Sequence, residues 1–362
     1  MTNYALLKKL CETPGIPSRE EQMRTLVAAE MRPLVDEVTL DAMGNVIGLK
    51  RGRGGPRVML AAHMDEIGFI VRYIDDKGFI RLHPVGGFDP RMLVAQRVWV
   101  HGFKGESLLG TLMLGVKPIH LQGADEKDKA TKIEDMFVDL GLPADKVKAQ
   151  VEIGDMVTMA RTQEFMGNMV VSKSLDARVS LFVMLEALRA LRAHTCDILA
   201  VATVQEEVGL RGATTAAFAL DPQIGVALDV TLANDFPGPP ESEHIVKLGQ
   251  GCAIKIMDSS LLCHPKLVRH FRDIAEREKI PHQLEILPRG GTDAGGMQRV
   301  RGGIPSFTLS VPVRYVHTVN EMAHKADIDA AIRLLTLFLQ EAHTRDYGYA
   351  EAKVKGKGKR SR

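Results

Sequence analysis

The sequence predicts an α/β protein in which a central, mostly parallel sheet flanked by helices is interrupted by a small β-rich domain. Near both ends of the chain, short apolar runs bounded by glycine, proline and charged residues alternate with helical spacing, as is typical of buried parallel strands. From residue 68 to about residue 161 the pattern changes to short, closely spaced strands. We therefore expect a discontinuous α/β domain, residues 1–67 and 166–350, and an inserted β domain, residues 68–165.

In the first segment, Ser18-Arg19-Glu20-Glu21 fits a capping box that opens a helix ending near Pro33. In the inserted segment, residues 69–74 and 79–83 flank an Asp-Asp-Lys-Gly turn and predict a β-hairpin. Further short strands are predicted at residues 97–101, 108–114 and 155–160, and a loop at the charged stretch 122–132.

Size and composition limit the class of protein. The 362 residues are 45% hydrophobic and 25% charged, which is enough to bury the cores of two domains. The four cysteines show no Cys-x-x-Cys spacing, so we expect reduced thiols and a cytoplasmic location. No run of 18 apolar residues and no signal-peptide pattern occurs, so neither a membrane span nor secretion is expected.

The end of the chain, residues 351–362, is a basic tail. Its last ten residues carry six Lys or Arg and no acid, whereas the whole chain has a net charge of +2, so the rest is mildly acidic. We expect a disordered, solubilising end, with contact to anionic surfaces as the alternative. The tail has no aromatic side chain to stack on bases, and no nucleic-acid partner is expected.

Four of the predicted strands lead to residues that can bind a metal. The runs 57–62, 197–203, 224–228 and 304–311 lead to His63, to Glu206 and Glu207, to Asp229 and to His317. Because ligands collect outside the carboxyl ends of parallel strands, we expect these side chains to share one cleft. Taken alone, the Glu206–Glu207 pair also fits a solvated turn, but two adjacent desolvated carboxylates need a cation or a reaction to stabilise them.

Asp176 is a fifth candidate, because it directly precedes the helical apolar spacing of residues 179–193. Aspartate is a favoured N-cap, so capping of this helix is the simplest interpretation. Metal binding is the alternative, and the two roles are compatible because one carboxylate oxygen can cap while the other binds a metal.

The residue types indicate a definite chemistry. Carboxylates mixed with imidazoles suit zinc, cobalt or manganese better than calcium or a thiolate site. A bridging carboxylate can hold two cations roughly 3.5–4 Å apart, which is the spacing of two-metal hydrolases. Since successive side chains of an extended chain point to opposite sides, Glu206 and Glu207 can divide the roles of base and ligand. Asp65 can return to the side of His63 and accept its ring N–H.

Six motifs follow one another along nearly the whole chain. They are residues 62–68, 175–178, 205–209, 227–231, 290–295 and 315–318, and the inserted stretch 132–141 accompanies them. In this order they resemble the M42 family of metallo-aminopeptidases, the group that contains the tetrahedral (TET) and glutamyl aminopeptidases. The sequence departs from the family pattern at Ala177 and Ser180, where Asp or Asn and Gly are frequent, but it lacks none of the metal ligands.

The resemblance implies a role for each residue of the site. His63 and Asp229 would bind one divalent metal ion, Glu207 and His317 a second, and Asp176 would bridge the two. Glu206 would be the general base, Asp65 would orient the His63 ring, and Thr292 and Asp293 would contact substrate from a glycine-rich loop. That loop has neither the Walker spacing nor the G-x-G-x-x-G register, so no nucleotide cofactor is expected.

The resemblance also implies a zinc-peptidase-like catalytic domain and an inserted β-barrel or PDZ-like domain that forms dimer contacts. The dimers would assemble into a tetrahedral homododecamer that admits peptides. We expect a two-metal aminopeptidase that removes N-terminal residues from peptides, with zinc or cobalt, or manganese, as the metal. A related two-metal amidase, such as an N-acyl amino-acid deacylase or a carboxypeptidase, is the alternative. A non-catalytic assembly or nucleic-acid-binding protein is the alternative from a different class.

Overall fold

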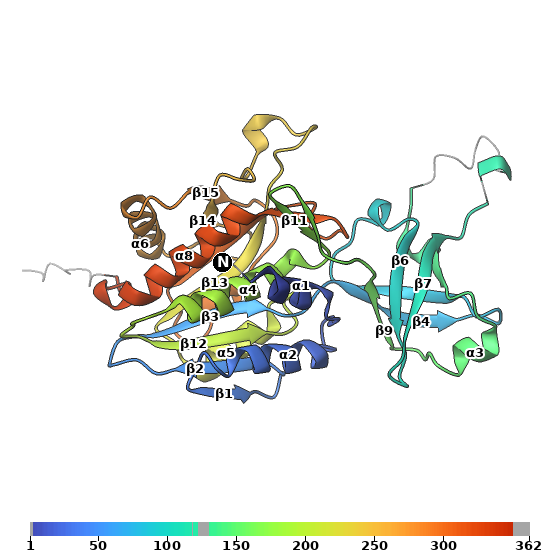
Figure 1. Cartoon of the computed structure of the whole chain (residues 1–362), viewed down its shortest axis with the longest axis horizontal. Coiled ribbons are helices and arrows are strands. Elements are labelled where there is room, and N and C mark those ends of the chain that lie inside the picture. The colour runs from blue at the N-terminus through green and yellow to red at the C-terminus, as the bar shows by residue number, and fades with distance from the viewer. Residues whose placement is uncertain (1–2, 118, 122–129, 350–362) are drawn as a thin grey trace, which may run out of the picture.

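A computed structural model describes residues 3–117, 119–121 and 130–349, which form an α/β body and a β-barrel extending from one side of it (Figure 1). The predicted basic tail, residues 351–362, and most of the predicted loop at 122–132 lie outside the described residues.

An eleven-stranded sheet runs through the α/β body. Nine strands follow one another across it: β1 (Glu37–Leu40), β2 (Val46–Lys50), β12 (Asp197–Thr203), β3 (Arg57–His63), β13 (Ile224–Leu232), β16 (Ser306–Arg314), β17 (Glu321–His324), β11 (Met169–Ser172) and β10 (Glu164–Met166). Two more branch from this path, since β14 (Cys252–Met257) pairs with β16, and β15 (His282–Ile286) pairs with β14.

Parallel pairing is concentrated at the centre of this sheet. Strands β12, β3, β13 and β16 are parallel neighbours, whereas β1–β2, β2–β12, β16–β17, β17–β11, β11–β10 and β14–β16 are antiparallel. The branch pair β14–β15 is also parallel. The sheet is therefore mixed, and the prediction of a mostly parallel sheet is not confirmed for the sheet as a whole. The edge strands β1 and β10 are largely exposed, and antiparallel strands tolerate such contact with water better than parallel ones do.

Helices cover both faces of the central strands, and every residue of β13 except the last is buried as a result. One face carries α4 (Leu175–Ala190), α8 (Lys325–Glu341), α1 (Tyr4–Glu12) and α6 (Pro265–Arg277), and the other carries α5 (Arg211–Leu220) and α7 (Asp293–Gln298). Among the described residues, none of these helices is both long and apolar enough to cross a membrane.

The capping box predicted at Ser18 is not formed. Helix α2 spans Glu21–Met31, with Glu20 at the N-cap position. Ser18 has a φ of 71°, so the chain turns before the helix begins, and its backbone N–H donates to the Glu20 carboxylate at 2.9 Å. The helix ends close to the predicted Pro33.

Six strands close into the barrel in the order β4–β5–β8–β7–β6–β9. Their bounds are β4 (Gly68–Ile74), β5 (Ile80–Val85), β6 (Gln96–His101), β7 (Ser107–Leu114), β8 (Met136–Asp139) and β9 (Met156–Met159), and the short helix α3 (Ala144–Lys148) precedes β9. The predicted hairpin is confirmed as β4–β5, and Asp75 stabilises its turn by accepting the N–H groups of Lys77 and Phe79 at 2.8 and 2.9 Å. The barrel is the expected closed β structure, while its likeness to a PDZ domain remains a prediction.

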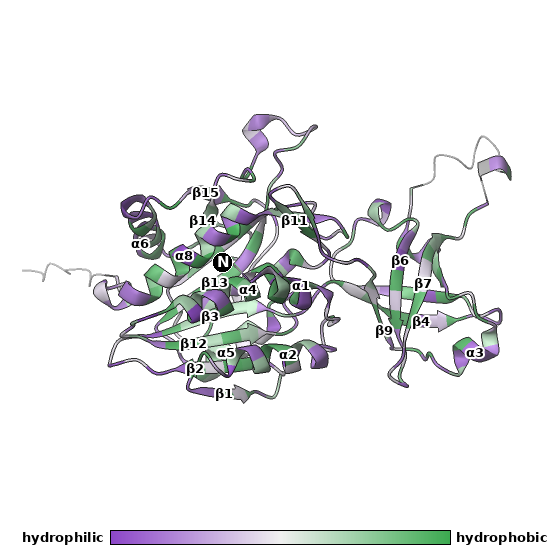
Figure 2. Cartoon of the chain, in the orientation of Figure 1, coloured by the Kyte–Doolittle hydropathy of each residue, from purple (hydrophilic) through white to green (hydrophobic). Residues whose placement is uncertain are grey.

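The two parts of the molecule have separate apolar cores. One cluster fills the α/β body, and another, which includes Phe69, Val98 and Val138, fills the barrel. Figure 2 shows hydrophobic residues along the central strands and hydrophilic residues interspersed along the helices. Val319 comes from the chain between β16 and β17, yet it packs in the barrel cluster and is only 6% exposed. The predicted domain boundaries remain a prediction, and β10 already belongs to the large sheet.

Replacing Asn45 with Ala is expected to lower the free energy of unfolding by about 2–4 kcal/mol, because buried polar groups that lose a partner cost about 1–3 kcal/mol each. Asn45 is fully buried, accepts the Val204 N–H at 3.0 Å and donates to the Gly212 carbonyl at 3.1 Å. Urea unfolding measures the change. Asn168→Ala, at an exposed turn, is the matched control, and equal small losses in both variants would contradict this role.

Candidate metal centre

The carboxyl ends of the central strands converge on one group of acidic and imidazole side chains. His63 is the last residue of β3 and pairs with Thr203 at the end of β12, which leads directly to Glu206 and Glu207. In the β13–β3 register, Ala227 pairs with Ala61, so Asp229 lies level with His63. The parallel register therefore brings together residues that are more than 160 positions apart.

Asp176 lies between the two histidines of the group. Its Oδ1 is 3.2 Å from His63 Nε2, and its Oδ2 is 3.3 Å from His317 Nε2. Asp229 Oδ1 lies 3.9 Å from His63 Nε2, and Glu207 Oε1 lies 3.4 Å from His317 Nε2. The group thus has two halves, each with one imidazole and one carboxylate, and they share Asp176.

The predicted capping role of Asp176 is not seen. Its carboxylate oxygens face the two imidazoles, and among the described residues no backbone N–H of the first turn of α4 donates to them. The adjacent glutamates also point to different histidines, because Glu206 Oε2 is 4.0 Å from His63 Nε2 whereas Glu207 is beside His317.

The buried carboxylates of this group would be stabilised by additional positive charge. Burial raises the pKa values of Glu206 and Asp229 well above their usual range, and the nearby His63 compensates only in part. Burial lowers the pKa of His317, but Glu207 and Asp176 outweigh this effect and raise it to about 12. Four carboxylates with two neutral imidazoles would be balanced by two divalent cations, which would take the place of these protons.

The donor set also has the geometry to hold cations. His63, Asp176 and Glu207 each offer a ligand atom, and these atoms lie within 4.8 Å of one another. His63 Nδ1 is 3.0 Å from the backbone carbonyl of Asp65, which is an acceptor only. The ring therefore carries a proton on Nδ1, which leaves Nε2 as the nitrogen that could bind a cation.

Asp65 orients more than the ring of His63. The sequence predicts that its carboxylate accepts the ring N–H, but that carboxylate lies 3.7 Å from Nδ1, and the carbonyl of Asp65 accepts instead. Its two carboxylate oxygens accept the backbone N–H groups of Glu206 and Glu207, each at 3.1 Å. One buried carboxylate thus fixes the backbone of both glutamates.

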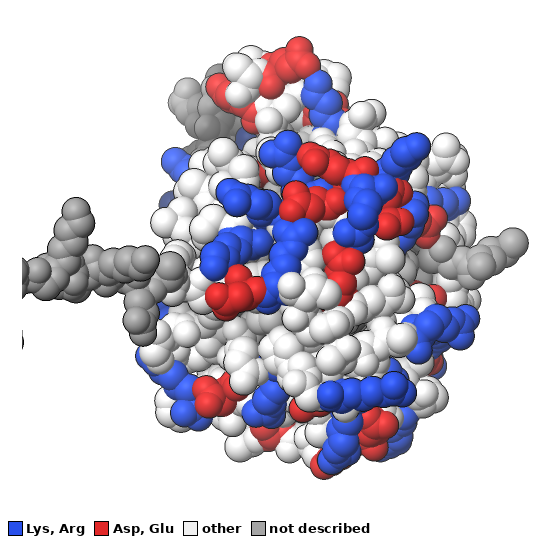
Figure 3. All heavy atoms as spheres, turned by 90° about the vertical axis from the view of Figure 1, so that its left-hand side faces the viewer, with Lys and Arg blue, Asp and Glu red and all other residues white. Residues whose placement is uncertain are grey.

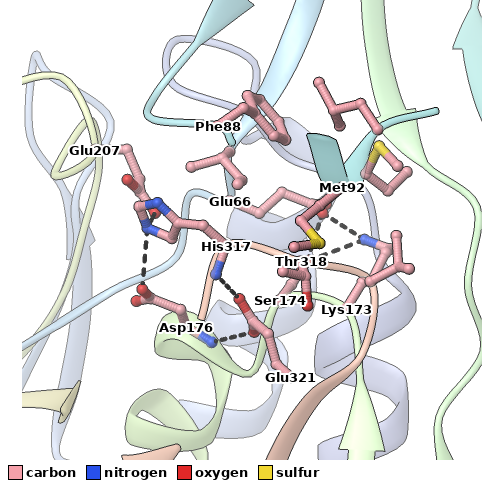
Figure 4. Close-up of a pocket in the computed structure, with 14 residues that line it drawn as sticks. Glu66, Phe88, Met92, Lys173, Ser174, Asp176, Glu207, His317, Thr318 and Glu321 are labelled. Carbon is pink, nitrogen blue, oxygen red and sulfur yellow. Dashed lines mark hydrogen bonds and ion pairs between the residues drawn. The ribbon is translucent and has the colours of Figure 1, made fainter. Parts of the chain in front are cut away.

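Glu321 likewise accepts hydrogen bonds from the backbone N–H groups of two members of the group, Asp176 and His317, as Figure 4 shows. Its Oε2 accepts the Asp176 N–H at 3.0 Å, and its Oε1 accepts the His317 N–H at 2.8 Å. The sequence analysis missed Glu321, because a single acid at the start of a short strand carries no recognisable signal. His317 itself has a φ of 64°, so this backbone contact holds it in an uncommon conformation.

A wide cleft of about 550 Å³ opens beside the group and reaches Asp176, Glu206, Glu207, Asp229 and His317. A smaller pocket adjoins it at Asp176, Glu207 and His317, and the barrel residues Phe88, Met92 and Met159 form part of its wall (Figure 4). In another part of the wall of that pocket, the carboxylate of Glu66 accepts hydrogen bonds from Lys173 Nζ and Ser174 Oγ, both at 2.5 Å.

Comparison with known proteins agrees with this geometry. The model of the M42 glutamyl aminopeptidase family matches residues 44–334, which include every residue of the group described above. The chain belongs to the M42 peptidase family. Its members are hydrolases, so the chain is an enzyme of that class.

Individual M42 relatives match over almost their full length. A lysyl aminopeptidase of Pyrococcus furiosus is 38% identical over 359 residues, which are 96% of this chain and 99% of the relative. An aminopeptidase structure from the archaeon Desulfurococcus kamchatkensis has a TM-score of 0.90 at 38% identity, with 94% of each chain covered. A TET peptidase of Pyrococcus horikoshii, described as assembling into a tetrahedron or a large octahedral shell, has a TM-score of 0.83 at 32% identity and covers 93% of this chain and 99% of its own.

Two of the residues that the M42 resemblance suggested for substrate contact are not placed for it. Thr292 and Asp293 are 1% and 2% exposed, and their side chains are hydrogen-bonded to Asp258 and Thr203 inside the protein. The cleft is lined instead by Gly290 and Gly291 of the same loop and by the neighbouring Arg289. The sequence motif identified the correct loop, but not which of its residues reach the cleft.

Glu20 lies behind Asp65, and burial and then the charge of Asp65 raise its pKa to about 7. The folded protein therefore holds this proton more tightly than the unfolded chain, whose glutamates titrate near 4.3. The resulting stability is present below about pH 4.3 and is lost as the pH rises to about 7, by up to about 3 kcal/mol.

Glu20→Gln is expected to remove this loss, so that the variant matches the parent protein near pH 4 and exceeds it in stability at pH 8. Chemical unfolding across this range, at constant metal content, measures the effect. Glu21→Gln changes the exposed neighbour and is the control. Parallel pH curves for Glu20→Gln and the parent protein would contradict the assignment.

Proposed function

We propose that this M42 enzyme is a two-metal aminopeptidase that hydrolyses the first peptide bond of its substrates. The observation that carries the proposal is the position of Asp176, whose two oxygens face different imidazoles at 3.2 and 3.3 Å. A carboxylate so placed is suited to bridge two cations.

In this proposal His63 and Asp229 hold one ion, Glu207 and His317 hold the other, and Asp176 is shared. Imidazole and carboxylate donors together suit zinc or cobalt, with manganese as a third candidate. Bound cations of this kind polarise a scissile carbonyl and lower the pKa of an attacking water to about 7.

Glu206 is the proposed general base. Its carboxylate lies beside His63 on the cleft, where it could accept a proton from a water molecule held by the cations. Asp65 holds the backbone N–H of Glu206 and so fixes the direction of approach. After taking the proton of the water, Glu206 can deliver it to the nitrogen of the leaving amine.

The wider architecture is proposed from the relatives. We infer that the chain forms homo-oligomers, in which residues 68–165 supply dimer contacts and dimers join into a tetrahedral dodecamer. The four cysteines are free and buried, which suits a reducing, cytoplasmic environment. Basic and acidic side chains are intermixed on the face turned away from the barrel (Figure 3), so this face does not present the continuous basic patch that is typical of nucleic-acid binding.

Glu206→Gln is expected to lower kcat at least about 100-fold, because a positioned general base contributes about 10²–10⁴ to the rate. Metal content measured by elemental analysis should stay at two ions per chain, since the substitution removes the base and no proposed ligand. Asp176→Ala is the contrasting variant and should lose both activity and metal. Full activity of Glu206→Gln with both metals bound would show that another group is the base.

The type of amide bond is tested with matched substrates on the metal-loaded parent protein. A leucine p-nitroanilide with a free amine should be cleaved, and its N-acetylated counterpart should be cleaved at least about 100-fold more slowly if the free N-terminus is recognised. Comparable rates would favour the N-acyl deacylase alternative. Release of C-terminal residues from a blocked peptide would favour the carboxypeptidase.

Light scattering tests the assembly. Twelve chains of 39.8 kDa would give a particle of about 480 kDa. A dimer alone would limit the proposal to the barrel contacts, and a monomer at all concentrations would reject self-association.

A further inference from the structure

Arg289 is the one basic residue among the described residues that line the cleft, which otherwise presents the carboxylates of the metal centre, the imidazole of His317 and uncharged residues. It is exposed, and within the described part of the chain its guanidinium makes no ion pair or hydrogen bond. A guanidinium that lines a cleft and pairs with none of the carboxylates of that cleft is available to a ligand.

The backbone around Arg289 is fixed on both sides. The Leu287 N–H donates to the Met257 carbonyl at 3.0 Å, and the Gly290 carbonyl accepts the Ser259 N–H at 3.0 Å and also the Ser259 hydroxyl. The loop is therefore joined to the chain after β14 immediately before and after Arg289. The backbone position of a side chain on such a loop is well defined.

Buried polar groups stabilise the contact between this loop and the end of β14. Asp258 accepts hydrogen bonds from the Thr292 hydroxyl at 3.0 Å and from the Ser260 N–H at 2.8 Å. Next to it, the fully buried Lys255 is paired with Glu285, the residue two positions before Leu287. The loop that carries Arg289 is thus supported by side chains that have no contact with the cleft.

The cleft that Arg289 lines also has apolar side chains in its wall. Leu210, Leu232, Leu287 and Val316 contribute to it, together with the metal-centre residues Asp229 and His317. Such a wall suits the methylene groups of a substrate, and the guanidinium suits a planar carboxylate at their end, which it can bind through two hydrogen bonds.

We propose that Arg289 is a specificity-determining residue that binds a carboxylate of the substrate. The proposal rests on the aminopeptidase function given above. Two sources can supply this carboxylate: the side chain of an N-terminal Glu or Asp, or the C-terminal α-carboxylate of a very short peptide. The acidic side chain is the source that also uses the apolar wall.

The test compares kcat/KM for the p-nitroanilides of glutamate and glutamine, which differ in charge but hardly in shape. The parent protein is expected to prefer glutamate, and Arg289→Gln to reduce this preference about tenfold, as loss of one charge-assisted interaction would. Arg289→Lys should retain part of it. Arg269→Gln, an exposed arginine on α6 outside the cleft, is the matched control and should change nothing.

A second pair of substrates separates the two sources. Leu-Gly and Leu-Gly-amide differ only in the C-terminal carboxylate. If Arg289→Gln weakens cleavage of Leu-Gly alone and leaves the glutamate preference intact, the bound group is the α-carboxylate. If neither preference responds to Arg289→Gln, the proposal is wrong.

Binding measured by calorimetry keeps this result distinct from the proposed function. Free glutamate is expected to bind the parent protein about tenfold more tightly than glutamine, and Arg289→Gln should abolish the difference. If the parent protein cleaves no free-amine peptide, the aminopeptidase proposal fails, while this binding difference still decides whether Arg289 recognises an acidic side chain. Equal binding of both amino acids by the parent protein would reject the acidic side chain as the bound group.

Discussion

Four carboxylates and two imidazoles are confined at the ends of the central strands, and the rest of the structure depends on this constraint. Asp176, Glu206, Glu207 and Asp229 are held close to one another where water has little access. Such a group is stable only when its charges are balanced and when its backbone cannot relax away from them. The parallel centre of the sheet determines the position of these groups, and the proposed divalent cations would balance their charge.

Two further buried carboxylates keep the group in place. Asp65 receives the amides of Glu206 and Glu207, and Glu321 receives those of Asp176 and His317. Each joins segments that are distant in sequence, and each acts on the backbone instead of on the reacting atoms. The positions of the proposed ligands are therefore set in part by hydrogen bonds to their backbone, which do not involve the side chains that would hold an ion.

The sequence predicted that most members of this group of acidic and imidazole side chains lie together because their positions follow from simple rules, while their role as metal ligands stays a prediction. Apolar runs locate strands, parallel strands align their carboxyl ends, and His63, Asp229 and the two glutamates come directly after or within such runs. Glu321 and Arg289 were not predicted, because their roles depend on which loops contact one another in the folded protein. Two predictions made from local motifs differ from the structure, namely the capping box at Ser18 and the exposure of Thr292 and Asp293 to the cleft. A local motif does not show how tertiary contacts will orient its side chains.

Val319 has a consequence for how the two cores of the molecule work together. It lies two residues after His317, yet it is packed among the apolar side chains of the barrel. The segment that carries one proposed metal ligand is therefore anchored in a different core from the strands that carry the others. Partial unfolding of the barrel would displace this proposed ligand and open the adjoining pocket while the large sheet stayed folded. The enzyme would then lose activity before it lost its fold. In an assembly held together through the barrel, a neighbouring subunit that tightens the barrel would by the same connection steady the catalytic centre.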